Sequence, residues 1–352
     1  MNPFITVVMP VRNEERFIGD TLNQLLAQDY PPDRYEIIVA DGMSTDGTRE
    51  IVRQMAQRDP RIRLLDNPKR LSGAGRNVGF RNGRGELFVV VDGHCHIPDP
   101  NLLRAVADLF RSSGADCLGR PQPLDPPGLT PFQRAVALAR ASRLGHGGDS
   151  LIYGDYEGFA SPVSNGAAYR REVFERIGYV DESFDACEDV EFNWRVEQAG
   201  MKAYTSPRLK VRYYPRESLK ALFRQMVRYG QGRFRLVARH RSALTVNQLI
   251  PAGFVAGLGT VALCALWSAL TGQLAYLTSI LAAVYLLYAV MIGLESLRIA
   301  AREGWEYLGH LPFVFFLVHF GLGFGFLKGA LSLRTATARL VSGVSNAQPE
   351  RF

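Results

Sequence analysis

The stretch Glu86-Leu-Phe-Val-Val-Val-Asp-Gly-His-Cys-His-Ile-Pro-Asp99 decides the fold class of the chain. Its apolar run at 88–91 predicts a strand buried on both faces, which is typical of a parallel sheet with helices on either side. Because side chains alternate along a strand, Asp92, His94 and His96 should share one face at its carboxyl end. Ligands bind at that end of such strands, so these residues indicate a divalent metal or a polar substrate. On this stretch alone, a charged strand end with two solvated histidines is an equally good interpretation.

Strands and helices alternate on both sides of this stretch. Apolar runs predict further strands at 5–10, where a proline ends the run, at 36–42 and at 62–65. Helical spacing and capping residues predict helices that cover 17–26, open at 44–48, open at the glycine-rich segment 71–79, and run from 99 to 110. This alternation predicts βαβ units, and therefore an α/β fold built on a parallel sheet.

Two of the predicted strands end in an aspartate followed by glycine, and these are Asp41 and Asp92. The carboxyl ends of parallel strands form the ligand crevice of open α/β sheets. Between them, the segment 73–79 offers backbone N–H groups and Arg76 at a helix start, which suits a diphosphate. It matches neither the P-loop nor the dinucleotide fingerprint. A nucleotide-sugar site needs a base-binding group, a metal for the diphosphate and a supporting cation. The residues suited to these roles are, in that order, Asp41, the pair of Asp92 and His94, and Arg76.

The alternation weakens after residue 112, where proline, glycine and aromatic residues become frequent. We expect a loop at 121–128, a mobile substrate-binding segment at 144–162, and a small, backbone-accessible stretch at 164–170. A short helix is predicted at 172–177.

Four carboxylates gather just before, or within the first turn of, an amphipathic helix predicted near 188. They are Asp185, Glu188, Asp189 and Glu191. Acidic side chains in that position interact favourably with the helix dipole, and taken alone this is the simpler interpretation. The functional alternative is that Glu188 or Asp189 acts as a general base in a loop at the rim of the site.

The composition narrows the class of protein and its compartment. The chain has 352 residues and a formal net charge of +7, which is compatible with nucleic acid, anionic lipid or a phosphorylated substrate as a partner. Its four cysteines are scattered, which fits a reducing cytoplasm and argues against a disulfide framework or a zinc finger. Residues 1–10 lack the basic start and cleavable apolar core of a signal peptide.

Basic residues concentrate between 202 and 241, where the only acid is Glu217. Four of them recur every four residues and form one stripe of a predicted helix, namely Arg216, Lys220, Arg224 and Arg228. A basic amphipathic helix directly before an apolar span indicates an element held against anionic lipid. Nucleic-acid binding is the weaker interpretation, because no recognised module accompanies the stripe.

Three apolar segments follow, at 249–270, 274–294 and 311–327. The first two are each long enough to span a bilayer and are joined by three residues, so they predict a tight hairpin. The positive-inside rule then places the α/β domain in the cytoplasm. The third segment carries three glycines and is followed by basic residues that three full spans would place outside, namely Lys328, Arg334 and Arg339. The sequence leaves open whether this segment is re-entrant or the charge rule is overridden.

Taken together, these motifs resemble a family-2 glycosyltransferase with the GT-A fold, over roughly residues 5–235. Residues 8–15 are similar to the opening strand and turn of that family, and Gly75-Arg-Asn-Val-Gly79 to a block near the nucleotide. The segment Ala40-Asp-Gly-Met-Ser-Thr-Asp-Gly-Thr48 matches the block written DDGSTDGT. Asp92-Gly-His94 stands at the D-x-D position of the family.

Two further matches complete the ordered set. Glu188-Asp189 stands at the position of the catalytic E-D pair, and Gln225-Met-Val-Arg-Tyr229 resembles the Q-x-x-R-W element of membrane synthases. The resemblance implies that Asp41 contacts the nucleotide base, that Asp92 and His94 hold a divalent cation, Mn²⁺ or Mg²⁺, and that Glu188 and Asp189 are catalytic. The other donor-binding residues that it implies are Pro10, Arg12, Glu14, Arg76, Gln225, Arg228 and Tyr229.

Two residues depart from the pattern of the family. His94 replaces the second aspartate of D-x-D and, as a softer ligand, suits manganese better. Tyr229 replaces the tryptophan of Q-x-x-R-W and keeps an aromatic platform with a polar tip.

The resemblance implies an inverting hexosyltransferase that acts in bacterial exopolysaccharide or cell-surface glycan assembly. By similarity to succinoglycan-type enzymes, the donor would be UDP-glucose and the acceptor a polyprenyl-diphosphate-linked sugar or another lipid. We expect the membrane and other glycan-assembly enzymes as partners, and no nucleic acid. Two alternatives are a processive polysaccharide synthase, for which three segments are few to form a channel, and a non-catalytic scaffold that binds nucleotide sugars.

The same interpretation divides the chain into four regions. A cytoplasmic GT-A domain would occupy 1–212, a basic interface region 213–245, a transmembrane region 246–331 and a polar tail 332–352. The protein would be a multi-pass protein of the inner (plasma) membrane, with its catalytic domain on the cytoplasmic side.

Overall fold

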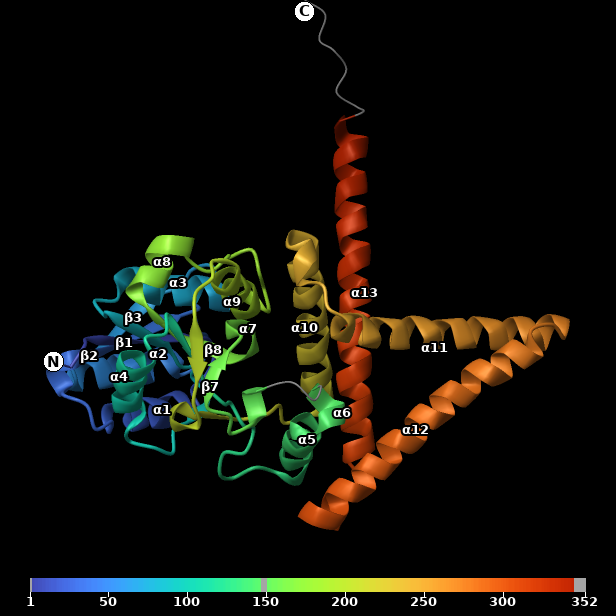
Figure 1. Cartoon of the computed structure of the whole chain (residues 1–352), viewed down its shortest axis with the longest axis horizontal. Coiled ribbons are helices and arrows are strands. Elements are labelled where there is room, and N and C mark those ends of the chain that lie inside the picture. The colour runs from blue at the N-terminus through green and yellow to red at the C-terminus, as the bar shows by residue number, and fades with distance from the viewer. Residues whose placement is uncertain (1, 147–150, 345–352) are drawn as a thin grey trace, which may run out of the picture. The chain divides into compact units, whose positions relative to one another are not determined.

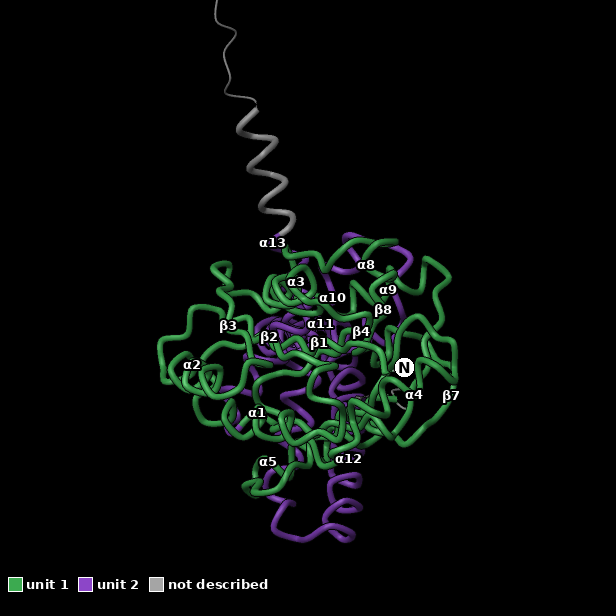
Figure 2. The backbone as a smooth tube through the Cα atoms, turned by 90° about the vertical axis from the view of Figure 1, so that its left-hand side faces the viewer, with its two compact units in different colours: residues 1–216 green, residues 217–352 purple. Residues whose placement is uncertain are grey.

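The structure is a computed structural model that describes residues 2–146 and 151–344, with the backbone alone described at 146 and at 333–344. It forms two compact units, residues 1–216 and 217–352 (Figure 2). Each unit is described by itself below.

The first unit is built on a mixed sheet of eight strands, in the order β3-β2-β1-β4-β8-β6-β9-β7. The strands are β1 (Ile5–Val11), β2 (Tyr35–Asp41), β3 (Ile62–Asp66), β4 (Leu87–Val90), β6 (Cys117–Gly119), β7 (Gly158–Ala160), β8 (Gly166–Arg170) and β9 (Ala203–Thr205). The first four strands are parallel, whereas β8 runs antiparallel between β4 and β6. A separate antiparallel ribbon joins β5 (Cys95–His96) to β10 (Arg212–Tyr213).

Helices cover both faces of this sheet (Figure 1). One face packs against α1 (Ile18–Leu26), α2 (Thr48–Arg58) and α4 (Leu102–Ser113), and the other against α3 (Ser72–Asn82), α8 (Arg171–Ile177) and α9 (Glu188–Gln198). The unit also contains α5 (Pro131–Ala141), α6 (Arg143–His146), α7 (Pro162–Asn165) and the 3₁₀ turns Pro32–Arg34, Leu151–Tyr153 and Pro207–Leu209.

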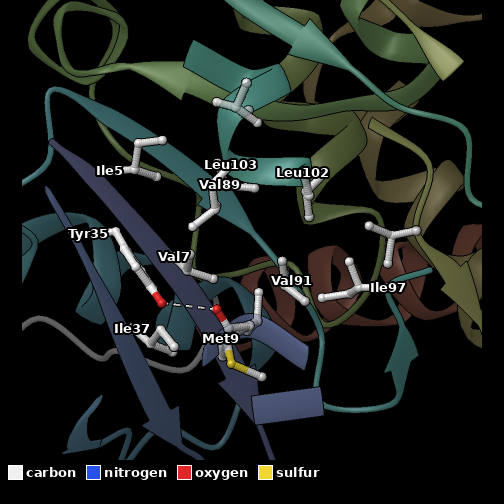
Figure 3. Close-up of a cluster of buried hydrophobic side chains, with 14 of the residues drawn as sticks. Ile5, Val7, Met9, Tyr35, Ile37, Val89, Val91, Ile97, Leu102 and Leu103 are labelled. Atoms are coloured by element: carbon white, nitrogen blue, oxygen red, sulfur yellow. Dashed lines mark hydrogen bonds between the residues drawn. The ribbon is translucent and has the colours of Figure 1, made fainter. Parts of the chain in front are cut away.

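The alternation of side chains along the strands produces two separate cores. Val7 of β1 and Val89 of β4 lie with Leu102 and Leu103 of α4 on one face (Figure 3). Val8, the residue next to Val7, lies with the aromatic cluster of the opposite face. Strands buried on both faces are characteristic of parallel sheets, so the apolar runs in the sequence have the expected cause.

The structure confirms the predicted α/β fold, the mostly parallel sheet of the GT-A fold and its leading strands, with two corrections. Pro10 does not end the first strand, because β1 continues to Val11, which pairs with Asp41. The prediction that 164–170 is a backbone-accessible segment is wrong, because Gly166–Arg170 form β8, which lies in the middle of the sheet. Of the predicted segment 144–162, residues 147–150 lie outside the described residues and the remainder includes β7.

The second unit consists of α10 (Leu219–Arg239), α11 (Val246–Thr271), α12 (Ala275–Glu303), α13 (Leu311–Val344) and the 3₁₀ turns Arg241–Ala243 and Trp305–Tyr307. Within the described part of the chain, α11, α12 and residues 311–332 of α13 are each long and apolar enough to cross a membrane. The third apolar segment is an unbroken helix, so its glycines do not interrupt it.

Candidate active site

Hydrogen bonds join the loop that follows β1 to the loop that follows β2, and these two loops form one side of the candidate site. The backbone N–H of Asn13 donates to Ser44 Oγ at 2.8 Å, and the N–H of Thr45 donates back to Asn13 Oδ1 at 2.9 Å. The N–H of Gly47 donates to Glu15 Oε2 at 2.7 Å. Asn13 and Met43 both adopt positive φ, a strained state that the reciprocal bonds hold in place.

Asp41 lies at the carboxyl end of β2, as predicted, but its carboxylate is fully buried. One oxygen accepts from the hydroxyl of Ser44 at 2.5 Å, and the other accepts from the N–H of Ser44 at 3.0 Å and from Arg49 at 2.6 Å. Arg49 also donates to Asp66, at the end of β3. Both oxygens of Asp41 therefore already accept hydrogen bonds that fix the loop.

Asp92 and His94 follow the carboxyl end of β4. His94 Nδ1 lies 2.8 Å from Glu14 Oε1, which leaves Nε2 as the nitrogen free of this contact. Burial alone would lower the pKa of His94, but the hydrogen bond to Glu14 and the charge of Asp92 outweigh it and raise the pKa. Thr21 Oγ1 donates to the carbonyls of Gly93 and Cys95, which holds the segment in place.

His96 has different neighbours. It pairs with Arg212 in the small ribbon, and its pKa is lowered by burial and then by the charge of Arg212. Among the described residues, no three His, Cys, Asp or Glu side chains are arranged to hold a metal ion. His96 thus does not complete a three-ligand site with Asp92 and His94.

Arg76 of α3 brings two predicted motifs together. Its guanidinium lies 3.6 Å from Glu188 Oε1, at the start of α9. Burial by itself would lower the pKa of Arg76, but the negative charges of Glu188, Asp189 and Asp92 raise it instead. Among the described residues, the Nε–H of this buried side chain has no hydrogen-bond partner. Arg76 is therefore a cation at which the D-x-H and E-D segments converge, with one donor still available.

The two acids of the E-D segment differ in exposure. Glu188 is buried, and burial raises its pKa while Arg76 opposes the shift. Asp189 is partly exposed, and one of its oxygens accepts from the N–H of Val190 at 2.9 Å. Of the two candidate bases, Asp189 is therefore the more exposed.

The glycines of α3 serve packing and do not form an open anion cradle. A Cβ at Gly73 would lie 3.2 Å from Val180 and 3.4 Å from Glu188, and one at Gly75 would lie 3.0 Å from Pro10. All three glycines of the segment 73–79 are buried. Their absent side chains let α3 approach both β1 and α9, which is what places Arg76 beside Glu188.

The remaining predicted residues occupy two parts of the chain. Pro10 packs against Gly75, and the exposed Arg12 lies over Gly42 at the end of the locked loops. Gln225, Arg228 and Tyr229 lie on α10 of the second unit, where Gln225 Nε2 donates to the hydroxyl of Tyr229 at 3.3 Å.

Sequence reasoning missed a buried pair behind the D-x-H segment. Arg120, which is 2% exposed, donates to the hydroxyl of Tyr213 at 2.7 Å, and its Nε and Nη1 have no hydrogen-bond partner in the part of the chain that the structure describes. Tyr213 pairs with Cys95, its ring lies 6.1 Å from that of His94, and burial raises its pKa well above the usual value. The ribbon that joins these residues is two residues long, so no periodicity could reveal it.

A comparison with known sequences decides the family. The profile described as "Glycosyltransferase like family 2" matches residues 2–232 of the chain. The chain belongs to glycosyltransferase family 2. This family-2 enzyme is 36% identical, over 70% of its length and 73% of the relative's, to the succinoglycan biosynthesis protein ExoA of Rhizobium meliloti.

A second relative covers nearly the whole chain. It is the dolichyl N-acetyl-alpha-D-glucosaminyl phosphate 3-beta-D-2,3-diacetamido-2,3-dideoxy-beta-D-glucuronosyltransferase of Methanococcus voltae, 26% identical over 93% of this chain and 97% of the relative. Among solved structures, the mannosyltransferase PcManGT of Pyrobaculum calidifontis, in complex with GDP-Man and Mn²⁺, superposes with a TM-score of 0.65 at 20% identity, over 94% of this chain and 88% of that one. The predicted GT-A fold and glycosyltransferase activity are confirmed, and the three apolar helices mark the family-2 enzyme as a membrane protein.

Proposed function

We propose that this enzyme transfers a hexose, with inversion, from a nucleotide diphosphate sugar to a hydroxyl of a lipid-linked acceptor during cell-surface glycan assembly. The observation that carries the proposal is the convergence of Asp92, Glu188 and Asp189 on Arg76. A cation with a spare donor suits a diphosphate, and the acids beside it suit proton removal from an acceptor. UDP-glucose, the donor that the resemblance to succinoglycan-type enzymes implies, is the donor to test first.

Asp189 is the general base of the proposed reaction. The acceptor hydroxyl gives its proton to Asp189 while its oxygen attacks the anomeric carbon from the side opposite the diphosphate. The bond between the anomeric carbon and the phosphate oxygen breaks, and its electron pair leaves with the nucleoside diphosphate. Glu188 is held by Arg76 and is buried, so its part is to position that guanidinium.

The leaving diphosphate needs positive charge, and the structure offers two sources. Arg76 supplies one through its spare Nε–H. A divalent cation, Mn²⁺ or Mg²⁺, held by Asp92 and His94 would supply the second. The residues fit such an ion, because a metal-binding histidine commonly presents its other nitrogen to a carboxylate, as His94 does to Glu14. Two protein ligands suffice where the diphosphate of the donor provides the others.

We propose that the nucleotide base binds at Asp41, near Pro10 and Arg12. Since both oxygens of Asp41 accept hydrogen bonds from Ser44 and Arg49, the base would reach this carboxylate by displacing one of these donors. The resemblance also implies donor-binding roles for Gln225, Arg228 and Tyr229.

The proposed location is the inner membrane, with the first unit on the cytoplasmic side. Nucleotide sugars are made in the cytoplasm, and the basic residues before α11 favour that side by the positive-inside rule. A polyprenyl-diphosphate-linked sugar is then the simplest acceptor, because its reacting hydroxyl lies at the inner leaflet.

Transfer of radiolabelled sugar tests the proposal. Membranes that contain the full chain are incubated with UDP-glucose, GDP-mannose or UDP-N-acetylglucosamine, a lipid extract, and Mn²⁺ or Mg²⁺. Metal-dependent label in the organic phase, as a product extended by one sugar, would support the proposal. Label in a long water-soluble polymer would indicate a processive synthase instead. Tight donor binding without transfer from any donor would indicate a non-catalytic scaffold.

A further inference from the structure

Helices α10 and α13 of the second unit pack against each other with their backbones in close contact. A Cβ at Gly325 would fall on the backbone of Val227, and one at Gly230 would fall on the backbone of Leu322 and Phe326. Further along both helices, Gly329 faces the Phe234 side chain at 3.0 Å. The numbers of the contacting residues increase in the same direction along both helices, so α10 and α13 run parallel and form one pair. Two of the three glycines in the third apolar segment, Gly321 and Gly325, are therefore contact points for α10, and the third, Gly323, is a contact point for α11.

Because α10 packs along α13, the charged residues of α10 would lie at the same depth in a bilayer as the part of α13 beside them. The stretch of α10 that contacts Phe320–Gly329 also carries Arg224, Arg228, Arg233 and Arg235, and α10 contains no acidic residue. If residues 311–332 crossed a bilayer, these arginines would lie at the depth of the hydrocarbon. An arginine at that depth is unfavourable even on the mildest insertion scale. A crossing of α13 is therefore opposed by the helix that is attached to it.

The contacts of the α11–α12 hairpin with α13 lie away from the hairpin tip. α11 contacts α13 through its first turns, where Pro251 and Val255 face Gly323, and α12 contacts it near the middle of α12, where the Tyr288 hydroxyl lies 2.9 Å from His319 Nδ1. Between these points most of the large apolar side chains of both helices are exposed. α11 leaves the α10–α13 pair crosswise, and α12 runs back obliquely from the hairpin tip (Figure 1).

α13 carries one continuous apolar stripe. Phe313, Phe316, Phe320, Phe324 and Leu331 recur at intervals of three, four and seven residues, so they share one face of the helix. Phe223 of α10 lies beside Phe320 and Phe324, and Phe254 of α11 lies beside Phe316, but four of the five side chains of the stripe are exposed. Three of the phenylalanine rings stack in sequence along the helix. Lys328 is exposed at the edge of the stripe, and the exposed Arg224 and Arg228 lie on the paired helix α10. An apolar stripe accompanied by cations is the combination found in elements that lie in the plane of a membrane surface.

We infer that α10 and α13 lie together in the head-group layer of an anionic bilayer, and that only the hairpin of α11 and α12 crosses it. The apolar stripe of α13 would enter the boundary of the acyl chains, and the arginines of α10 would stay among the phosphates. Two crossings return the chain to the side from which it started. Lys328, Arg334 and Arg339 then lie on the same side as the first unit, in agreement with the positive-inside rule.

Depth measurements with nitroxide spin labels test the in-plane position of α13. Single cysteines replace Phe313, Phe316, Phe324 and Leu331 in the full chain with Cys264→Ala, reconstituted in vesicles of anionic and zwitterionic phospholipid. Collision with oxygen and with a water-soluble nickel complex reports the depth of each label. Equal, shallow depths at all four positions are expected. A depth that rises toward the middle of the series and falls again would overturn the inference, whether the helix spans or is re-entrant. Leu266→Cys on α11 is the positive control for a deep label.

The side of the C-terminus provides the second measurement. A reporter that is active on one side of the membrane only is fused after Phe352, and in a second protein it is inserted at the hairpin tip after Gly272. The inference predicts opposite outcomes for the two fusions, with the C-terminal reporter on the side of the first unit. Equal outcomes would mean three crossings and would overturn it. Neither measurement uses sugar transfer, so failure here is separate from failure of the proposed function.

Discussion

His94 and Glu14 form a hydrogen-bonded pair whose chemistry differs from that of His96, two residues away. The carboxylate of Glu14 fixes the ring of His94 and leaves Nε2 for a ligand, whereas His96 lies beside the guanidinium of Arg212. A carboxylate that orients a metal-binding histidine is part of the metal site even though it does not touch the metal.

This difference predicts the effect of substitutions on metal dependence. Glu14→Ala should raise the Mn²⁺ concentration that gives half-maximal sugar transfer roughly 10–100-fold, because the ring of His94 loses its orientation. His96→Ala should leave it unchanged. A metal titration of both variants checks the prediction, and an equal shift in the two would contradict the assignment of His94.

Glu36 is a fully buried carboxylate on β2 that no catalytic role requires. It accepts hydrogen bonds from Thr6 Oγ1 at 2.9 Å, from the N–H of Arg84 at 2.6 Å and from Arg63 at 2.9 Å. Burial alone would raise its pKa, but these bonds to the charged form outweigh burial and lower the pKa below its ordinary value of 4.5.

The lowered pKa predicts how stability depends on pH. A carboxyl group whose pKa is lower in the folded state contributes stability above its unfolded pKa, and that contribution is lost as the pH falls through the folded pKa. Glu36→Gln should therefore cost roughly 1–3 kcal/mol near neutral pH and much less in acid. Urea unfolding of the detergent-solubilised chain between about pH 7 and about pH 3 measures this, with the exposed Glu175→Gln as control. A constant difference across that range would contradict the prediction.

At the level of elements, the contact between α3 and β1 fixes the site. A Cβ at Gly79 would overlap both methyl groups of Val8, so this position requires the smallest side chain. In the same way, Gly73 lets α3 lie close to α9, and Gly75 lets it lie close to Pro10. The distance between Arg76 and Glu188 depends on this packing.

Replacement of one such glycine tests the role of the contact. Gly79→Ala should lower the free energy of unfolding by about 1–3 kcal/mol through overpacking against Val8. It should also weaken donor binding, since α3 moves away from the site. Gly154→Ala, where a Cβ would meet no atom within 4 Å, is the matched control. Equal unfolding midpoints for the two variants would show that α3 has room for the methyl group.

Some elements could be predicted from the sequence because the residues that determine them lie within the element itself. β1, β2 and β4 are apolar runs that need no knowledge of distant residues. β8 is Gly-Ala-Ala-Tyr-Arg, with little apolar character, and it becomes a strand because β4 and β6 on either side supply pairing partners from 47 to 83 residues away in the chain. The glycines of α3 and α13 indicated an anion loop and a helix break from sequence alone, whereas both sets are contact surfaces between elements.

At the level of the whole molecule, the sequence divides by hydropathy into a polar part and an apolar part, and the structure forms two compact units, residues 1–216 and 217–352. The candidate catalytic residues were predicted one by one from motifs. That Arg76 joins two of these motifs, and that Arg120 and Tyr213 lie behind one of them, depends on tertiary packing and could not be predicted from the sequence.

The apolar hairpin predicts how the whole chain is held in the membrane. The large apolar side chains of α11 and α12 are exposed along most of their length, so these helices should hold the protein in the bilayer independently of charge. The full chain should stay in the membrane pellet after a wash in about 1 M salt, where charges are screened beyond about 3 Å, and after an alkaline wash. Release by salt alone would show that only the basic surface of α10 binds lipid.

The most direct test of the central claim compares Asp189→Asn with Glu197→Gln, an exposed acid at the other end of the same helix. Both variants are assayed in membranes for transfer of labelled sugar to lipid, and for binding of the nucleotide sugar. We predict that Asp189→Asn keeps donor binding and loses transfer by roughly 10²–10⁴-fold, while Glu197→Gln keeps both. Transfer by Asp189→Asn at the wild-type rate would contradict the account, because the acceptor proton would then be removed by another group.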